Sequence, residues 1–135
     1  MSELYARDLT ASARRHLVAA DRLIGTDRGD VAGYLYGWAA ECSLKQIMFD
    51  SGMRELSLDK KRDDPFYAHF EALRDMLSDR AYGRRADTIR RFVDDKRTMQ
   101  FWATAMRYSD GRSIKPEWIS RWQVCARALV AELGL

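Results

Sequence analysis

The chain has 135 residues and a mass of 15.6 kDa, enough for one domain with its own apolar core. Apolar residues make up 47% and charged residues 32%, which excludes a disordered chain, and no apolar run is long enough for a membrane-spanning helix. The formal net charge of +3 permits an anionic partner without demonstrating one.

Val, Ile and Thr never alternate with polar residues as a half-buried strand requires, and the chain has only two prolines and eight glycines. These features predict an all-α protein. No repeat, low-complexity tract or linker divides the sequence, so we expect a single domain over residues 1–135, an up-and-down bundle of four to five helices.

The first predicted helix runs from about Thr10 or Ser12 to Ile24, and the turn at 25–29 makes it an antiparallel hairpin with the second. The second helix covers residues 30–51 and ends at Gly52, which suits a left-handed cap. It is apolar nearly all round and therefore central. Glu41 and Lys45 lie in its middle, four residues apart, and charges in such a helix are paired or lead to a pocket.

Three further helices follow a charged connection over residues 54–64. Asp64-Pro65 is a strong start for a third helix reaching to about Tyr82. The fourth is expected over about residues 86–106. Pro116 opens the fifth, whose apolar stripe comprises Trp118, Ile119, Trp122, Cys125, Ala126, Leu129, Val130 and Leu133.

The N-terminal residues lack the apolar segment of a secretory signal, and each cysteine, Cys42 and Cys125, falls within an amphipathic helix. Both read as reduced core thiols, so we expect a cytoplasmic protein. The histidines and cysteines are scattered singly and no phosphate-binding loop is present, so the sequence predicts no metal site and no cofactor.

A family resemblance rests on two short motifs. The central helix contains Ala40-Glu41-x-x-Leu44-Lys45, and Arg107-Tyr108 precedes the last amphipathic helix. With the hairpin before them and His69 between them, they make residues 10–133 resemble the HEPN superfamily. Those are small four- or five-helix bundles found beside minimal nucleotidyltransferases, in toxin–antitoxin pairs and in RNA-processing proteins. The resemblance implies a HEPN-like bundle.

Active members of that superfamily are metal-independent ribonucleases that carry an arginine, four to six residues, and then a histidine. A histidine moves the proton for 2′-OH attack, and an arginine stabilises the phosphorane charge. No histidine follows Arg107 at that spacing. Six residues separate Arg62 from His69, but the interval crosses Pro65, so the two side chains need not share a helical face.

The candidate binding residues are those polar groups that helical phasing directs inward, together with a neighbouring tyrosine: Glu41, Lys45, His69, Arg107 and Tyr108. If the four charged or titratable groups converge, they form either a structural network or the floor of a ligand pocket. A hydrogen-bonded core position is the favoured interpretation of His69. No residue is assigned a catalytic role.

The sequence therefore predicts a non-catalytic HEPN-like binding module that engages a nucleotide, RNA, or a cognate nucleotidyltransferase or antitoxin. A homodimer is expected, because the tryptophan-rich stripes are hard to bury within one chain. The alternative is a metal-independent endoribonuclease that uses Arg107 or Arg62 with His69. A structural subunit without a ligand of its own is the third hypothesis.

Overall fold

The computed structural model describes residues 4–134, and in this range the chain is helical, with no strand. Five α-helices are present: α1 (Leu9–Leu23), α2 (Gly29–Ser51), α3 (Ala72–Leu77), α4 (Ala86–Val93) and α5 (Pro116–Ala131). Three short 3-10 helices join them: η1 (Leu58–Asp63), η2 (Pro65–Tyr67) and η3 (Thr104–Tyr108). None of these described helices is long and apolar enough to cross a membrane.

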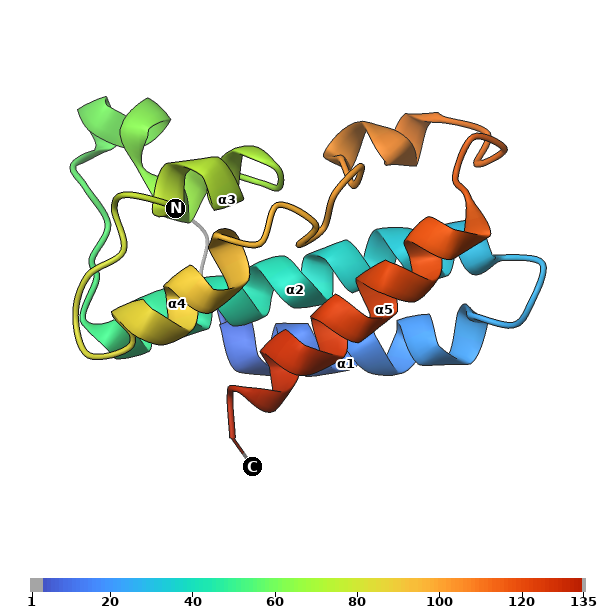
Figure 1. Ribbon diagram of the computed structural model, residues 1–135, viewed down its shortest axis with the longest axis horizontal. Coiled ribbons are helices and arrows are strands. Elements are labelled where there is room, and N and C mark those ends of the chain that lie inside the picture. The colour runs from blue at the N-terminus through green and yellow to red at the C-terminus, as the bar shows by residue number, and fades with distance from the viewer. Residues whose placement is uncertain (1–3, 135) are drawn as a thin grey trace.

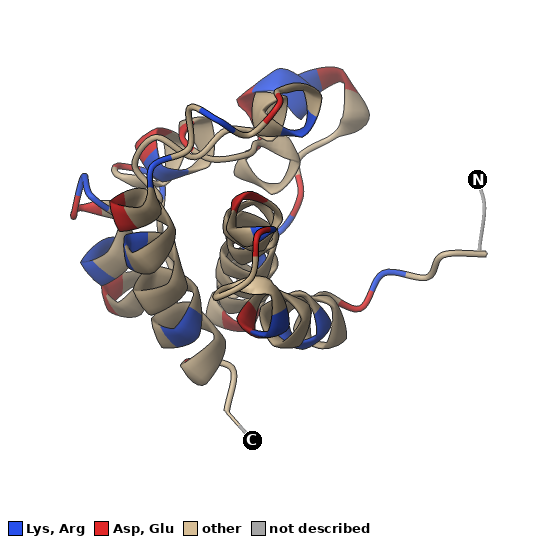
Figure 2. Cartoon of the chain, turned by 90° about the vertical axis from the view of Figure 1, so that its right-hand side faces the viewer, with Lys and Arg blue, Asp and Glu red and all other residues tan. Residues whose placement is uncertain are grey.

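Helix α2 is the centre of the bundle (Figure 1). α1 and α5 pack along it, and the segments that carry α3 and η3 cover another of its sides. Its buried residues lie all round the helix: Ala32, Gly33, Tyr36, Gly37, Ala39, Ala40, Glu41, Ser43, Leu44, Lys45, Ile47, Met48 and Ser51. The predicted end is confirmed, since Gly52 has a φ of 103° and its N–H donates to the Met48 and Phe49 carbonyls. Charged residues of both signs occur on the surrounding elements (Figure 2).

A polar junction joins the three long helices. The buried Tyr36 of α2 donates its hydroxyl proton to Asp21 Oδ1 of α1 over 2.5 Å. From α5, Gln123 donates to the same oxygen and Arg127 lies 3.3 Å from Oδ2. Burial raises the pKa of Asp21, but the hydrogen bonds from Tyr36 and Gln123 and the charge of Arg127 outweigh it, leaving this pKa below the ordinary 3.8.

Tyr36→Phe is expected to lower the free energy of unfolding by about 1–2 kcal/mol near neutral pH, because Asp21 loses its shortest hydrogen bond. A carboxyl group whose pKa is depressed on folding contributes stability above its unfolded pKa, and this is lost as pH falls through the folded value. The cost of Tyr36→Phe should therefore shrink at about pH 3. Urea unfolding of both proteins at the two pH values checks this, and an equal cost at both would contradict it.

The predicted third helix is wrong in extent. Asp64 does start a helical turn, since its Oδ1 accepts from the N–H of Phe66, but the turn is only η2. The other oxygen, Oδ2, accepts from Leu56 N–H over 2.7 Å, so this buried side chain also ties down the preceding connection. Ala68 is extended, with φ −86° and ψ 156°, and α3 begins only at Ala72. His69 thus lies in an irregular segment.

The predicted fourth helix also ends early, at Val93. Beyond it the backbone carbonyls of Lys96 and Thr98 accept from the Arg74 guanidinium over 2.6 and 3.2 Å. Met99 and Phe101 have φ values of 53° and 72°, which no α-helix contains. This irregular stretch turns the Trp102 ring onto α2, where it is 1% exposed. The chain resumes a helical turn only at η3.

The fifth helix begins at Pro116 as predicted, and Ile119, Trp122, Ala126 and Leu129 form its buried face. The tryptophans on which the homodimer prediction rests pack within the chain. Trp102 and Trp122 are 1% exposed, and Trp118 stacks on Phe101 with ring centroids 4.7 Å apart. The reason given for a dimer therefore does not hold, and the dimer itself stays a prediction.

Candidate functional site

One side of α2 carries four chemically distinctive side chains at helical spacing: Tyr34, Trp38, Glu41 and Lys45. Their spacing of four, three and four residues places them in a single row. The row faces the irregular segment before α3, which supplies His69, the stretch after α4, which supplies Trp102, and η3, which supplies Arg107. We call Tyr34, Trp38, Glu41 and Lys45 the α2 row.

Glu41 joins its two basic neighbours through both carboxylate oxygens. Lys45 Nζ donates to Oε2 over 3.0 Å, and His69 Nδ1 lies 3.0 Å from Oε1 and 3.1 Å from Oε2. The Glu41 and Lys45 side chains are only 5% and 10% exposed, whereas that of His69 is 48% exposed. The charges that the sequence places inside α2 are thus paired, and the network reaches solvent at the imidazole.

The core position expected for His69 is wrong, although its hydrogen bond is present. The reason is the irregular backbone after Ala68, which leaves the ring at the surface with one edge against Glu41. Because a carboxylate can only accept, Nδ1 carries the proton in this contact. The second ring nitrogen, Nε2, has no hydrogen-bond partner within residues 4–134.

An aromatic cluster continues the row from the imidazole. The Trp38 ring meets His69 edge-on at 5.4 Å between centroids and meets Trp102 and Tyr34 in the same way at 5.7 and 6.0 Å. Tyr34 stacks on Trp102 at 5.6 Å. Trp102 is fixed by its indole N–H, which donates to the Gly33 and Tyr34 carbonyls. These ring contacts pack the α2 row against the segment before α3 and the stretch before η3.

Arg107 and Tyr108 lie at the far end of this cluster. The Arg107 guanidinium is 5.0 Å from the centre of the Tyr108 ring, and Tyr108 is 80% exposed. Hydrogen bonding with Tyr108 and Tyr34 raises the pKa of Arg107 further, so it is a permanent cation. The exposed pair presents a charge and an aromatic face together.

A cavity of about 320 Å³ opens beside Arg107. Arg28, Asp30, Tyr34 and Asp110 line it together with the apolar side chains of Val31, Met106 and Ile114. The Asp30 Oδ1 atom is buried without a hydrogen-bond partner, and its nearest cation is the Arg28 Nε atom at 3.5 Å. The cavity therefore contains both charge signs and one incompletely satisfied acceptor.

The five candidate residues thus form two groups instead of one. Glu41, Lys45 and His69 make the first, and Arg107 with Tyr108 makes the second. Arg107 contacts Tyr34 and His69 contacts Glu41, and these two α2 residues are seven positions apart, a rise of about 10 Å along the helix. The α2 row connects them, and the first group reaches the surface at His69 and the second at Arg107 and Tyr108.

Arg62, the other arginine considered for catalysis, does not join either group. It is exposed in η1 and lines a shallow hollow of about 300 Å³ with Lys61, Asp64, Tyr67 and Ala68. The neighbours of the His69 ring in the described chain are instead Glu41 and Trp38. The geometry gives no support to an Arg62–His69 pair.

The two cysteine thiols and the possible metal ligands are the other reactive side chains of the chain. Burial raises the pKa of the Cys125 thiol to about 12 and also raises that of Cys42, so neither is a ready nucleophile. Across residues 4–134, no three His, Cys, Asp or Glu side chains gather as they would around a metal ion.

No family model, curated protein or solved structure matches this chain. The HEPN resemblance consequently rests on the short motifs in the sequence and stays a prediction.

The sequence reasoning missed the connecting members of the site. Trp38 and Tyr34 could have been found by continuing the spacing of Glu41 and Lys45 towards the N-terminus of the same helix. Asp30 gave no such signal, because a carboxylate in the first turn of a helix is ordinary. The loop at Gly111, far away in the sequence, packs directly against its carboxylate in the cavity.

Proposed function

We propose that this chain is a non-catalytic, HEPN-like module of the cytoplasm that binds single-stranded RNA or a nucleotide at the exposed residues beside the α2 row, His69, Arg107 and Tyr108. The observation that carries the proposal is the pairing of Arg107 with the exposed Tyr108 ring beside the cavity. Proteins bind unpaired nucleotides by stacking bases on aromatic rings and placing arginine on the phosphates. Trp38 and His69 extend the surface for a second nucleotide. A homodimer, and a nucleotidyltransferase or antitoxin as protein partner, remain part of the proposal.

Fluorescence anisotropy with a labelled ten-nucleotide single-stranded RNA tests it. We expect micromolar binding that weakens with salt, and a loss of about 1–3 kcal/mol in Tyr108→Ala from lost base stacking. Arg107→Ala should weaken binding about tenfold and flatten the salt dependence. Arg112→Ala is the matched control, because this arginine is 89% exposed and lies outside the cavity lining. An equal loss in the control, or no binding at about 100 μM, would refute the proposal.

A ribonuclease is the second candidate, because Glu41 orients the His69 ring and leaves Nε2 available as a base. Against it stands the division of the candidate residues: His69 contacts Glu41 and Trp38, Arg107 contacts Tyr34 and Tyr108, and no contact within residues 4–134 joins the histidine to the arginine. We therefore expect wild-type protein to cleave RNA no faster than His69→Ala in the presence of a chelator. Cleavage that is abolished in both His69→Ala and Arg107→Ala would establish the enzyme instead.

A further inference from the structure

The outer face of α1 is a second surface without a role in the site above. A shallow hollow of about 870 Å³ on this face is lined by seven residues: Ala11, Arg14, Arg15, Val18, Ala19, Arg22 and Leu23. Along the sequence, steps of three residues alternate with steps of one. We call this set the α1 stripe. An i, i+3, i+4, i+7 pattern is the pattern by which one helix packs on another. In the bundle, the opposite face of α1 already packs on α2.

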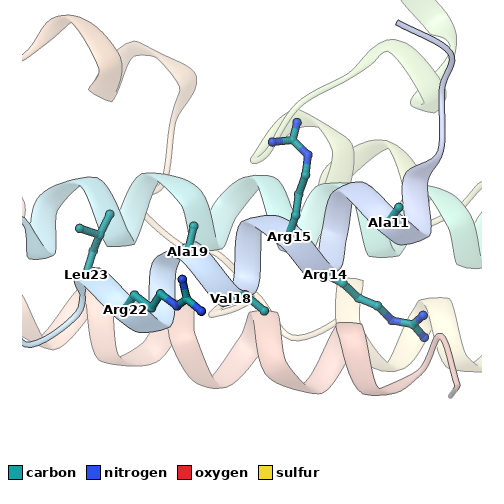
Figure 3. Close-up of a pocket in the computed structure, with 7 residues that line it drawn as sticks. All are labelled: Ala11, Arg14, Arg15, Val18, Ala19, Arg22 and Leu23. Carbon is teal, nitrogen blue, oxygen red and sulfur yellow. The ribbon is translucent and has the colours of Figure 1, made fainter.

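The surface shape of the α1 stripe suits packing by a second helix. Ala11 and Ala19 are small and leave room for a close backbone, while Val18 stands between them and is 52% exposed. Arg14 and Arg15 extend to opposite sides of the helix, and Arg22 lies beside Val18 one turn further along (Figure 3). The middle of the surface is therefore apolar and its edges are cationic.

No acidic side chain balances these arginines on the stripe. Asp8 accepts from Ala11 N–H as the helix cap, and Asp21 is held by Tyr36 and Arg127 on another side of α1. Arg14 donates to the Gly134 carbonyl, but Arg15 and Arg22 have no ion-pair partner in the described chain. Two fixed positive charges thus flank an exposed valine.

From this arrangement we propose that the α1 stripe docks an acidic amphipathic helix of a partner protein. The partner helix would place aliphatic residues on Ala11, Val18 and Ala19 and carboxylates on Arg15 and Arg22. A second copy of this chain fits poorly, because a two-fold pairing of α1 brings arginine against arginine. RNA fits poorly as well, because the stripe offers aliphatic side chains and no ring for a base to stack on.

This docking surface is independent of the RNA site. α1 lies on one side of α2, and the segment that carries His69 and α3 lies on another (Figure 1 and Figure 2). A protein partner on α1 would leave His69, Arg107 and Tyr108 accessible. Failure of RNA binding and failure of helix docking are therefore separate results.

The test uses a stapled synthetic helix in which leucine and glutamate alternate at successive turns of one face, with fluorescence anisotropy at low salt. Wild-type protein should bind it with micromolar affinity, and Arg15→Glu/Arg22→Glu should bind at least about tenfold more weakly. The matched control is Arg112→Glu/Arg121→Glu, which changes the net charge equally at two other exposed arginines and should bind like wild type. A peptide with lysine in place of glutamate should prefer the Arg15→Glu/Arg22→Glu variant.

Circular dichroism checks that both double variants are folded, which exposed positions should allow. No saturable binding of the peptide at about 1 mM, or equal weakening in the two double variants, overturns the proposal. So does a wild-type dimer that Arg15→Glu/Arg22→Glu dissociates in sedimentation, because the occupant is then a second copy. Selective loss of the ten-nucleotide RNA in the same variant would assign the stripe to nucleic acid.

Discussion

Glu41→Ala is expected to lower the free energy of unfolding by about 3–5 kcal/mol, far more than an exposed pair of the same spacing would. The Lys45 side chain is 10% exposed, and its ammonium group is paired with the Glu41 carboxylate over 3.0 Å. Without that carboxylate, the buried cation has no ion-pair partner left within residues 4–134. An exposed i, i+4 pair contributes only about 0.3–0.5 kcal/mol, so urea unfolding distinguishes the two situations clearly.

The double variant Glu41→Ala/Lys45→Met is the control for this prediction. It removes the stranded cation as well, so it should recover a large part of the lost stability and the two substitutions should be strongly non-additive. His69→Ala alone should cost much less, because the imidazole is 48% exposed and Glu41 keeps its bond to Lys45. A cost below about 0.5 kcal/mol for Glu41→Ala would mean that the pair is energetically ordinary.

The elements that the sequence predicted well are those whose signals are local. The hairpin of α1 and α2, the glycine cap at Gly52 and the start of α5 at Pro116 all follow from spacing and capping chemistry within one turn. Burial of Glu41 and Lys45 followed in the same way, from two charges in a helix that is apolar nearly all round. Helical period alone is sufficient for such inferences.

The elements that the sequence predicted badly depend on distant partners. The apolar spacing of residues 86–106 is compatible with one long helix, yet the chain leaves helical geometry after Val93. Arg74 binds the carbonyls of this stretch from twenty-two and twenty-four residues away, and Trp102 bonds α2 carbonyls from nearly seventy. No local pattern contains this information. The same early exit carries Arg107 away from Glu41 and divides the candidate site.

The structure also explains why both groups of the site contact the α2 row. Trp102 lies in the stretch before η3, and its contacts with Tyr34 and Trp38 pack this stretch, five residues before Arg107, against α2. A helical fourth segment would have placed Arg107 elsewhere. The position of the Trp102 ring therefore determines the geometry of the proposed RNA surface as well as the packing of the core.

Gly37→Ala tests that dependence, and we expect it to destabilise the protein by about 2–4 kcal/mol although alanine is the better helix former by about 1 kcal/mol. An added Cβ would lie 1.8 Å from Trp102 Cε2 and 2.0 Å from its Nε1, so the ring must leave its site. Trp102 is 1% exposed and would lose its bonds to the Gly33 and Tyr34 carbonyls. Because loss of a buried aromatic ring costs about 3–5 kcal/mol, displacement outweighs the gain in helix propensity.

Gly29→Ala is the matched control in the same helix: its Cβ would meet only Ile119 Cδ1 at an ordinary 3.8 Å, so stability should be unchanged or slightly higher. Thermal unfolding and tryptophan fluorescence report both effects, and a Gly37→Ala variant as stable as Gly29→Ala would show that Trp102 does not fix the α2 row.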